Sequence, residues 1–391
     1  MEAFVRTARK PPVREGSDQK TNFDENWNRG VNEKNKKRNM KRTIIRYEDI
    51  VCFNALFNAW KKISTGDGKG DRADVIDYAL NLDGNLHKLQ SKLEAGTWKP
   101  DKGRNFMLFT EGKWREIHVV DVETRIVYQS LVTAFNIKHL FVNRTFGAIK
   151  GRGTLKANKQ VRRDLYRHPE LDYCIKTDFH HFYPSIKKQK LKEKIRRKYK
   201  GERAIQLMEA CIDAYLPESE EGISIGAVTS QDNGNLYLTD MDRYILGDLK
   251  MPCLARNVDD TVILCNKQDA PRVIEGLKQK AAELGLQYGK IALFPIGSRR
   301  IDFCGWAVNR ESNRVRKSTV VRYKKRLRAM TKRPLRIHKQ MSVIASYNGI
   351  LKFGDAYMLN KKLRKDYYEV FSRINRYSAH KRSENRKAPI A

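Results

Sequence analysis

Apolar residues in the first part of the chain recur with the spacing of an α-helix. Between residues 46 and 95, one predicted helical face carries Ile50, Phe53, Leu56, Phe57 and Trp60. Residues three and four apart lie on the same side of a helix, so this pattern predicts amphipathic helices. The glycine-rich stretch GDGKGD at 66–71 interrupts them. It lacks the G-x-x-x-x-G-K-[ST] spacing of a phosphate-binding loop and is predicted to be a flexible connector.

Between Leu171 and Val308 the pattern changes to short apolar runs that alternate with amphipathic stretches. Strands are predicted at 171–178, 253–256, 261–265, 287–294 and 300–308. Helices are predicted at 184–199, 203–215 and 271–284, and around Leu238, Met241 and Ile245, after a glycine-containing loop at 222–234. Residues 257–260 supply the turn of a hairpin between two of the strands. The order strand, helices, hairpin, helix, strand predicts an α+β fold with a ferredoxin-like sheet backed by helices.

Length and charge narrow the class of protein. A chain of 391 residues is long enough for two or three sub-domains that share one continuous core. Lys and Arg number 79 against 45 Asp and Glu, a net charge of +34 spread over the whole chain, which predicts a polyanionic partner. A ribosomal or architectural protein is the simpler alternative, but the 17 Tyr, 15 Phe and 5 Trp are more aromatics than such proteins usually carry.

Cysteine usage and hydropathy indicate a cytoplasmic protein. The six cysteines contain no C-x-x-C pair and are predicted to be buried thiols in a reducing compartment. The first residues lack the apolar core of a signal peptide, and no stretch approaches the roughly 20 apolar residues of a membrane helix. We therefore expect no membrane partner.

Both ends of the chain are polar. Residues 1–45 form a basic extension that contains KNKKRNMKR at 34–42, and such a segment cannot bury a core alone. It is predicted to be a solvated tail, with an RNA-binding arm as the alternative. Beyond Glu311 the chain is predicted to be helical and basic to about Ser378, followed by a polar tail at 379–391.

Three carboxylates carry the candidate chemistry. Asp178 ends one predicted strand, and Asp259 and Asp260 lie at the tip of the hairpin that the topology sets beside it. Clustered carboxylates repel one another unless hard cations such as Mg²⁺ lie between them. Two metal ions held in this way are a common device for nucleotidyl transfer. An isolated Asp-Asp pair, however, is more often an exposed turn. Here the strand context and the basic composition of the chain favour a metal site instead.

These residues lie in motifs that resemble those of reverse transcriptases. KTDFHHFYPSI (176–186) is similar to their motif A, and ARNVDDTVIL (255–264) is similar to the Y-x-D-D motif C. Further resemblances are GKWREIHVVDVETRIVYQSLV (112–132) to a finger motif, FGAIKGRGTLKA (146–157) to a template-contacting motif, 270–294 to motif D, RIDFCGW (300–306) to the primer grip and SYNGILKFGDAYMLNKKL (346–363) to the thumb. The resemblance covers about residues 46–378. It implies a right-hand polymerase fold, with the fingers and the first palm segment at 46–170, the rest of the palm with the carboxylates at 171–310 and a helical thumb at 311–378.

The resemblance also implies roles for single residues. Asp178 and Asp259 would bind two Mg²⁺ ions, for which Mn²⁺ may substitute, with Asp260 assisting and the Phe179 carbonyl as a further ligand. Nucleotide-binding roles fall to Lys113, Arg115, Tyr183, Gln231 and Lys290, of which Tyr183 would exclude a 2′-hydroxyl and Lys290 would act as general acid. Template and primer contacts fall to Ile225, Gly226, Asn257, Gly305, Trp306, Arg322, Lys324 and Lys325. The adjacent His180 and His181 lack Cys or His partners and are predicted not to be a metal site.

Two positions specify or question the lineage. The loop Ile225 to Gln231 reads I-G-x-x-x-S-Q, which is similar to diversity-generating retroelement enzymes, whereas group II intron and retron enzymes usually carry Q-G-x-x-x-S-P. Enzymes of diversity-generating retroelements make error-prone cDNA from a template-repeat RNA. Asn257 stands where the family pattern has an aromatic residue, which puts activity in question, since a stacked ring contributes about 1–3 kcal/mol.

The expected partners follow from the same resemblance. They are deoxynucleoside triphosphates, a template RNA and its RNA/cDNA duplex, a structured retroelement RNA and a small basic helical accessory protein. One alternative is a phage-defence or retron-type reverse transcriptase. The other is a degenerate polymerase fold that only binds RNA, which Asn257 keeps open and the three intact carboxylates argue against.

Overall fold

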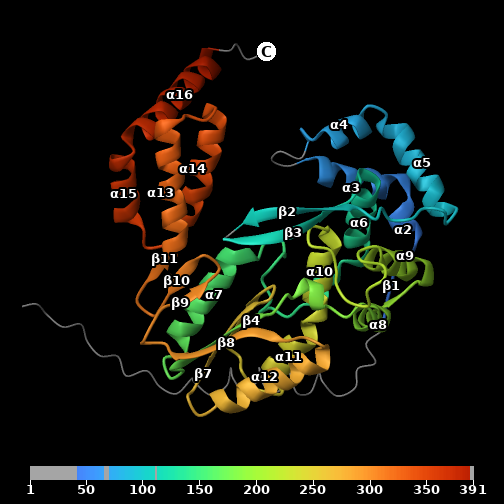
Figure 1. The fold of residues 1–391 in the computed structure, drawn as a ribbon, viewed down its shortest axis with the longest axis horizontal. Coiled ribbons are helices and arrows are strands. Elements are labelled where there is room, and N and C mark those ends of the chain that lie inside the picture. The colour runs from blue at the N-terminus through green and yellow to red at the C-terminus, as the bar shows by residue number, and fades with distance from the viewer. Residues whose placement is uncertain (1–41, 66–69, 111, 388–391) are drawn as a thin grey trace, which may run out of the picture. The chain divides into compact units, whose positions relative to one another are not determined.

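The computed structural model describes residues 42–65, 70–110 and 112–387, and leaves the side chains of 113 and 381–387 outside that description. By its internal contacts the chain divides into two units, Met1–Thr43 and Ile44–Ala391. The predicted basic extension therefore lies almost entirely outside the described residues, as does most of the predicted connector at 66–71. All helices and strands after β1 (Thr43–Ile44) lie in the second unit (Figure 1).

Helices, one short strand and one hairpin make up the described chain before the main sheet. In chain order these are β1 (Thr43–Ile44), α2 (Glu48–Val51), α3 (Phe53–Ser64), α4 (Ala73–Ala79), α5 (Leu82–Glu94), β2 (Arg104–Thr110), β3 (Lys113–Val119), α6 (Val122–Phe135), the 3-10 helix η1 (Ile137–Leu140) and α7 (Gly153–Arg167). The predicted apolar face is confirmed, because Ile50, Leu56 and Trp60 are buried. Phe53 and Phe57 pack against the same core. Helix α3 packs on α6, so residues far apart in the sequence share one core.

A four-stranded antiparallel sheet follows. Its strands are β4 (Tyr173–Phe179), β6 (Leu254–Asn257), β7 (Asp260–Cys265) and β8 (Tyr288–Pro295), in the order β6-β7-β4-β8. The connections contain η2 (Tyr183–Ser185), α8 (Lys188–Lys198), β5 (Tyr199–Lys200), α9 (Glu202–Asp213), α10 (Val228–Tyr237), α11 (Thr239–Gly247) and, between β7 and β8, α12 (Ala270–Leu284). This strand order confirms the predicted ferredoxin-like sheet within an α+β fold.

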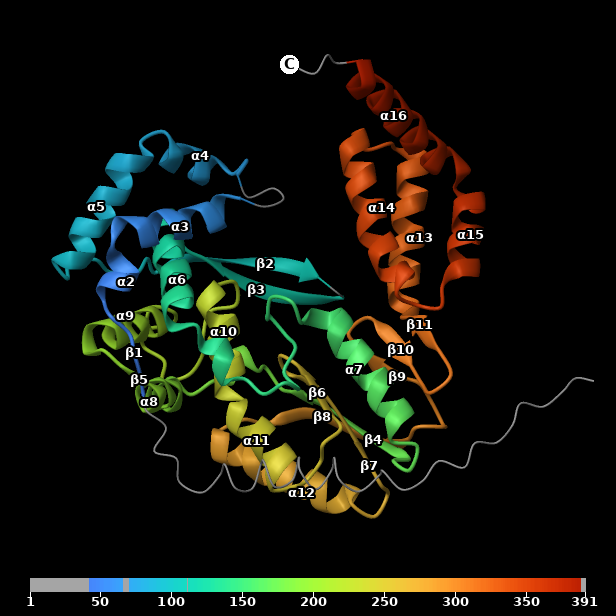
Figure 2. The ribbon, with the colours of Figure 1, turned by 180° about the vertical axis from the view of Figure 1, so that it is seen from behind.

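The two faces of the sheet are covered by different layers. Ile175 and Ile263 belong to the core that includes α8 to α12, whereas Cys174 and Val262 belong to a second core that includes residues of α7. This division follows from the alternation of side chains along a strand. Both ribbon views show α11 and α12 together on one side and α7 on the other (Figure 1 and Figure 2).

The stretch 300–308 is not one strand of the main sheet, so that prediction was wrong. It folds into β9 (Ile301–Phe303) and β10 (Trp306–Val308), and β11 (Asn313–Val315) adds a third strand to this separate sheet. The chain reverses at Cys304 and Gly305, whose φ angles are 52° and 93°. Positive φ is a turn conformation that a continuous strand cannot contain. Strand β11 also corrects the prediction that the chain is helical from Glu311 onwards.

Four helices complete the described chain. They are α13 (Lys317–Lys332), α14 (Ile337–Lys352), α15 (Tyr357–Asp366) and α16 (Tyr368–Lys387). They bury their own core around Tyr323, Leu327 and Leu363. The described residues thus contain three separate cores rather than the single continuous one predicted. Helix α16 also extends beyond Ser378, where a polar tail was predicted, because its Lys, Arg and Glu residues are good helix formers.

Helix α10 begins inside the stretch 222–234, which was predicted to be a loop. Its side chains are mostly polar and yet buried, among them Thr229, Ser230, Asp232 and Asn233. A helix that buries polar residues has no amphipathic pattern, so the periodicity of the sequence gave no signal. Tertiary packing decides the conformation of this segment instead.

The cysteines are free thiols, and most of them are buried. All six cysteines are free, and Cys174, Cys211, Cys253 and Cys265 are buried as predicted. Cys304 is half-buried and Cys52 is exposed, so the prediction of buried thiols fails at Cys52, which occupies the N-terminal end of α3. Within the described ranges, no helix is both long and apolar enough to cross a bilayer.

Candidate active site

Three carboxylates come together at one end of the four-stranded sheet. Asp178 lies near the end of β4, and Asp259 and Asp260 lie at the turn between β6 and β7. Strands β4 and β7 pair with Thr177 opposite Thr261, so the same register continues to Asp178 beside Asp260. The pairing of the strands therefore brings these residues of distant segments to one edge.

The charged residues of this edge point to one face of the sheet. Lys176 and Asp178 alternate with buried neighbours along β4, and Lys290 of β8 is the register partner of Asp178. Cys174 lies on the same face and packs in the core that includes α7. Side chains two apart on a strand share a face, so the carboxylates and Lys290 lie on the side away from α12.

A bulge marks the end of β4. The register of β4 and β8 shifts between Asp178 and Phe179, because Asp178 pairs with Lys290 while Phe179 pairs with Tyr288. Bulges bend a strand and re-aim a side chain, often beside an active site. The Phe179 ring stacks on Tyr288 with centroids 4.4 Å apart and fixes this end of the strand. The predicted role of the Phe179 carbonyl as a metal ligand stays a prediction.

Burial and mutual repulsion raise the pKa values of the hairpin carboxyls. The pKa of Asp259 is raised by burial and by the Asp178 charge, while Arg115 lowers it. Burial raises the pKa of Asp260 to about 6, with smaller increases from the two other carboxylates and an opposing effect of Lys176. The Lys176 Nζ lies 3.4 Å from Asp260 Oδ1. Burial and the neighbouring carboxylates therefore disfavour the charged forms of Asp259 and Asp260, and a bound cation would relieve this penalty.

The oxygen atoms of this site suit a hard divalent cation. Asp260 Oδ1 is buried, and its partner is the Lys176 ammonium at 3.4 Å, which is longer than an ordinary charge-assisted hydrogen bond, so this oxygen retains the capacity to bind a cation. Carboxylate oxygens are the ligands that Mg²⁺ prefers. Among the residues that the structure describes, however, no group of three or more Asp, Glu, His or Cys side chains is arranged to hold a metal ion.

Tyr183 lies between the carboxylates and α10. Burial raises its pKa to about 12, and the next largest cause is the charge of Asp259. A Cβ built on Gly234 of α10 would lie 3.2 Å from the Tyr183 ring, so the two segments are in close contact. Gln231 is exposed in the first turn of α10. This arrangement leaves the Tyr183 ring near the site, as its predicted role in sugar selection requires.

The loop before α10 is fastened to strand β3. The His118 amide donates to the Ile225 carbonyl at 3.0 Å, and the His118 ring hydrogen-bonds to Ser224 Oγ at 2.9 Å. Gly226 has a φ of 128°, and a Cβ there would lie 2.6 Å from the His118 carbonyl oxygen. Only glycine fits this close approach. The predicted template loop is thus held by the strand that also carries Arg115.

The remaining predicted residues lie in three further places. Asn257 is half-buried at the end of β6, opposite Asp260. Lys113 begins β3, but its side chain lies outside the described part of the chain. Arg115 is exposed on β3. His180 and His181 contact each other edge to face, with centroids 4.2 Å apart.

The predicted primer and duplex contacts are divided between β10 and α13. Gly305 forms the turn before β10, and Trp306 is 4% exposed and donates its indole N–H to the Ile350 carbonyl at 3.3 Å. The Trp306 ring therefore packs against α14 and is not open to a primer. On α13, Arg322 and Lys325 are three residues apart and share a face, whereas Lys324 points to the other side.

Sequence reasoning missed residues that surround the carboxylates. Lys176 stands two residues before Asp178, and the alternation of strand β4 could have identified it as a neighbour of Asp260. Arg256 is a charged residue in an otherwise apolar strand, which is an unusual sign in itself. The partners of His118 come from segments far away in the sequence, and no local pattern indicates them.

Comparisons with known proteins give a distant structural likeness. No family model matches the chain, and no curated protein matches it. Among solved structures, it is similar to an apo telomerase from Candida tropicalis truncated from its C-terminal domain, with 15% sequence identity and a TM-score of 0.43. The match covers 55% of this chain and 55% of that one, so this chain spans about half of the telomerase chain.

Proposed function

We propose that this protein is an RNA-directed DNA polymerase. One observation carries the proposal: Asp178 and the Asp259–Asp260 turn meet at the end of a ferredoxin-like sheet, where burial and the charge of Asp178 raise the pKa values of Asp259 and Asp260. Residues of motifs that resemble reverse transcriptases thus meet in space. The basic chain, with a net charge of +34, supports a nucleic acid as substrate. In this proposal residues 46–170 are the fingers with the first palm segment, 171–310 the rest of the palm and 311–378 the thumb.

The carboxylates would hold two Mg²⁺ ions, for which Mn²⁺ can substitute, with the Phe179 carbonyl as a further ligand. Such ions activate the primer 3′-hydroxyl and neutralise the pyrophosphate that leaves. Arg115 would bind the triphosphate, since a guanidinium suits phosphate oxygens. Lys290, the partner of Asp178 in the sheet, would donate a proton to pyrophosphate. Tyr183 would exclude a 2′-hydroxyl group.

More specifically, we propose an enzyme of a diversity-generating retroelement, which makes error-prone cDNA from a template-repeat RNA in the cytoplasm. The support is the I-G-x-x-x-S-Q loop, which is packed against β3 beside the site. Ile225 in place of glutamine offers fewer polar contacts to the templating base. The expected partners are a structured retroelement RNA and a small basic helical accessory protein. A phage-defence or retron-type enzyme is the alternative within the same class.

Primer extension tests this proposal. The full chain with Mg²⁺ or Mn²⁺, deoxynucleotides and a primed RNA template is expected to extend the primer. The double variant Asp259→Ala, Asp260→Ala should lose extension, while Asp269→Asn, at a half-buried carboxylate before α12 that pairs with Arg272, should retain it. Misincorporation concentrated opposite template adenines would support the retroelement assignment. An even spread of errors would count against it.

RNA binding without synthesis is the second candidate function. Asn257 favours it, because the residue opposite Asp260 lacks the aromatic ring of the family pattern. If wild-type protein does not extend a primer even with its accessory protein and native RNA, and yet binds that RNA, the polymerase proposal is wrong. The RNA-binding role then stands.

A further inference from the structure

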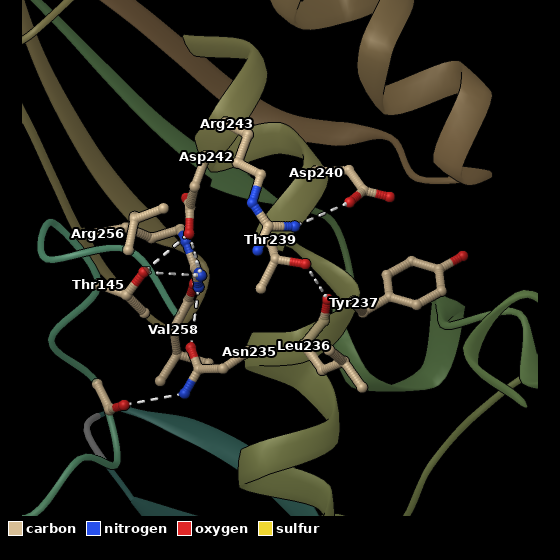
Figure 3. A network of polar contacts seen from close by, with 12 residues as sticks. Thr145, Asn235, Leu236, Tyr237, Thr239, Asp240, Asp242, Arg243, Arg256 and Val258 are labelled. Carbon is tan, nitrogen blue, oxygen red and sulfur yellow. Dashed lines mark hydrogen bonds and ion pairs between the residues drawn. The ribbon is translucent and has the colours of Figure 1, made fainter. Parts of the chain in front are cut away.

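A buried ion pair lies directly behind the catalytic turn. Arg256 of β6 is 1% exposed, and Asp242 of α11 is fully buried. The guanidinium meets the carboxylate in a two-pronged pair, Nε to Oδ1 and Nη2 to Oδ2, both at 2.6 Å. Thr145 donates its hydroxyl to Asp242 Oδ2 at 2.8 Å. Figure 3 shows these side chains pointing toward one another from separate segments of the chain.

The third nitrogen of Arg256 reaches the turn itself. Nη1 donates to the Val258 carbonyl at 2.7 Å and to Asn235 Oδ1 at 2.9 Å. The Val258 carbonyl belongs to the peptide bond that joins Val258 to Asp259. The side chain of Arg256 is therefore hydrogen-bonded to the backbone immediately before a catalytic carboxylate.

The network also includes the segment before α7. Asn235 donates to the Gly147 carbonyl at 2.9 Å, and the amide of Phe146 donates to the Arg256 carbonyl at 2.8 Å. A Cβ built on Gly147 would lie 2.6 Å from both Cγ2 and N of Val258. Three segments that resemble substrate-contacting motifs, namely 146–157, the α10 region and the 255–264 hairpin, thus meet at one buried group.

Val258 has an unfavourable backbone conformation. Its φ is 63°, in the left-handed region, which is costly for a β-branched residue. Strain of this kind persists only where the surroundings determine it, and it concentrates at functional sites. The hydrogen bond from Arg256 and the contact with Gly147 are the surroundings that do so here.

Stability alone does not explain the buried pair. The desolvation of two charges often cancels their attraction, so a buried ion pair contributes little compared with apolar residues of the same size. A second Arg–Asp pair, Arg144 with Asp164, has Nη1 at 2.7 Å from Oδ2, and its arginine side chain is 24% exposed. The Arg144 carbonyl accepts from the Arg256 amide at 3.0 Å, a backbone bond that a side-chain substitution leaves in place. This pair offers a reference for the effect of such a pair on folding.

We propose that Arg256, oriented by Asp242, is a positioning residue that fixes the Val258–Asp259 peptide and so aims the Asp259 carboxylate. This inference rests on the proposed polymerase function for its kinetic consequence. Its structural consequence, a rigid turn, does not depend on that function. Arg256 itself contacts no substrate in this proposal.

The test compares Arg256→Lys with the control Arg144→Lys in the full chain. Lysine keeps the charge beside Asp242 but cannot bond to Asp242, Asn235 and Val258 together. We expect a kcat for primer extension at least about tenfold lower, since small misplacements of reacting groups have large effects on rate. The KM for deoxynucleotide should change by less than about threefold, and the control should resemble wild type.

Two readouts are independent of activity. Hydrogen exchange of peptides covering 254–265 should speed up in Arg256→Lys, with unchanged exchange in the α13–α16 helices. Binding of Mn²⁺ alone, followed by its paramagnetic signal, should weaken in the same variant and not in Arg144→Lys. If Arg256→Lys does not fold, Asn235→Ala removes one bond to Arg256 and one to Gly147 while the ion pair remains, and should give the same changes at smaller size.

The outcomes separate the two proposals. Faster exchange at the hairpin with weaker Mn²⁺ binding supports positioning, even where wild-type protein proves inactive and the polymerase proposal fails. Wild-type exchange and wild-type kcat in Arg256→Lys would overturn the positioning role. So would equal losses in Arg256→Lys and Arg144→Lys, which would reduce Arg256 to a general contributor to folding.

Discussion

Two of the hairpins, β6–β7 and β2–β3, are built in opposite ways. The β6–β7 hairpin carries the candidate carboxylates Asp259 and Asp260, its strand residues are almost all buried, and its turn is bonded to Arg256. The β2–β3 hairpin exposes large apolar side chains, including Phe109 at 58% and Trp114 at 65%. The difference shows where rigidity is needed. In the proposed function, the carboxylates must be held in place and are braced, whereas the exposed aromatic side chains of β2–β3 remain open to bind RNA.

Removing one partner of the buried pair is the most severe way to break this contrast. Asp242→Leu leaves the Arg256 charge buried without its carboxylate, and we expect a loss of about 3–5 kcal/mol in the free energy of unfolding. Chemical denaturation measures it. The double variant Asp242→Leu, Arg256→Met should regain most of that loss. A single variant as stable as wild type would contradict the burial of the charge.

Asp232 tests the polar interior of α10 by its dependence on pH. Burial raises the pKa of Asp232 to about 6, against the opposing charge of Lys138, whereas the unfolded chain titrates near 3.8. The folded state therefore binds the proton more tightly, and its stabilising contribution is full below about pH 4 and lost as the pH rises through 6.

We therefore expect wild type to lose about 2–3 kcal/mol relative to Asp232→Asn across that window, because each pKa unit corresponds to about 1.4 kcal/mol. Neighbouring Tyr183 and Tyr199 remain protonated there, since burial raises the pKa of each. Denaturant unfolding of both proteins at several pH values gives the difference. A constant difference from pH 4 to pH 6.5 would exclude the titration of Asp232 as its cause.

Gly147 tests the steric side of the brace. A methyl group at this position would overlap Val258, so Gly147→Ala should cost about 1–3 kcal/mol and also slow primer extension. Gly349→Ala in α14 meets nothing within 4 Å and should be neutral or slightly stabilising. Thermal unfolding of the two variants gives the comparison. Equal melting temperatures would mean that the turn moves away without cost.

The exposed hairpin should respond in the opposite sense. Trp114→Ser removes a 65% exposed ring that packs edge to face with Phe109, with ring centroids 5.2 Å apart, so stability should change by less than about 1 kcal/mol. RNA affinity should nevertheless fall by about tenfold, because exposed aromatics stack on bases. Fluorescence anisotropy with single-stranded RNA measures this. Leu80→Ser, at an 83% exposed position, is the control and should leave affinity unchanged.

Local patterns in the sequence were enough to predict the sheet and the meeting of the carboxylates. The apolar runs at 253–256 and 261–265 and the turn residues at 257–260 predicted β6 and β7, and the element order predicted their place beside β4. Which residues of β4 share the site follows from the alternation of side chains along a strand. These features depend on neighbours in the sequence, so a single chain reveals them.

Other features depend on residues that meet only in the folded chain. Helix α10 buries polar side chains, so no apolar stripe distinguished it from a loop. The bonds from Arg256 to Asp242 and Asn235 join separate elements and leave no local pattern. The turn at Cys304 and Gly305 splits one apolar run into two strands. The prediction missed this turn because a half-buried cysteine with positive φ carries no sequence signal.

The separate core of α13–α16 has a consequence for how this molecule can evolve. Its buried residues, such as Tyr323 and Leu363, belong to neither of the cores that hold the sheet. Substitutions there can accumulate or be exchanged between lineages without disturbing the geometry of the carboxylates. Selection can thus change this helical region and the site of the three carboxylates independently of each other.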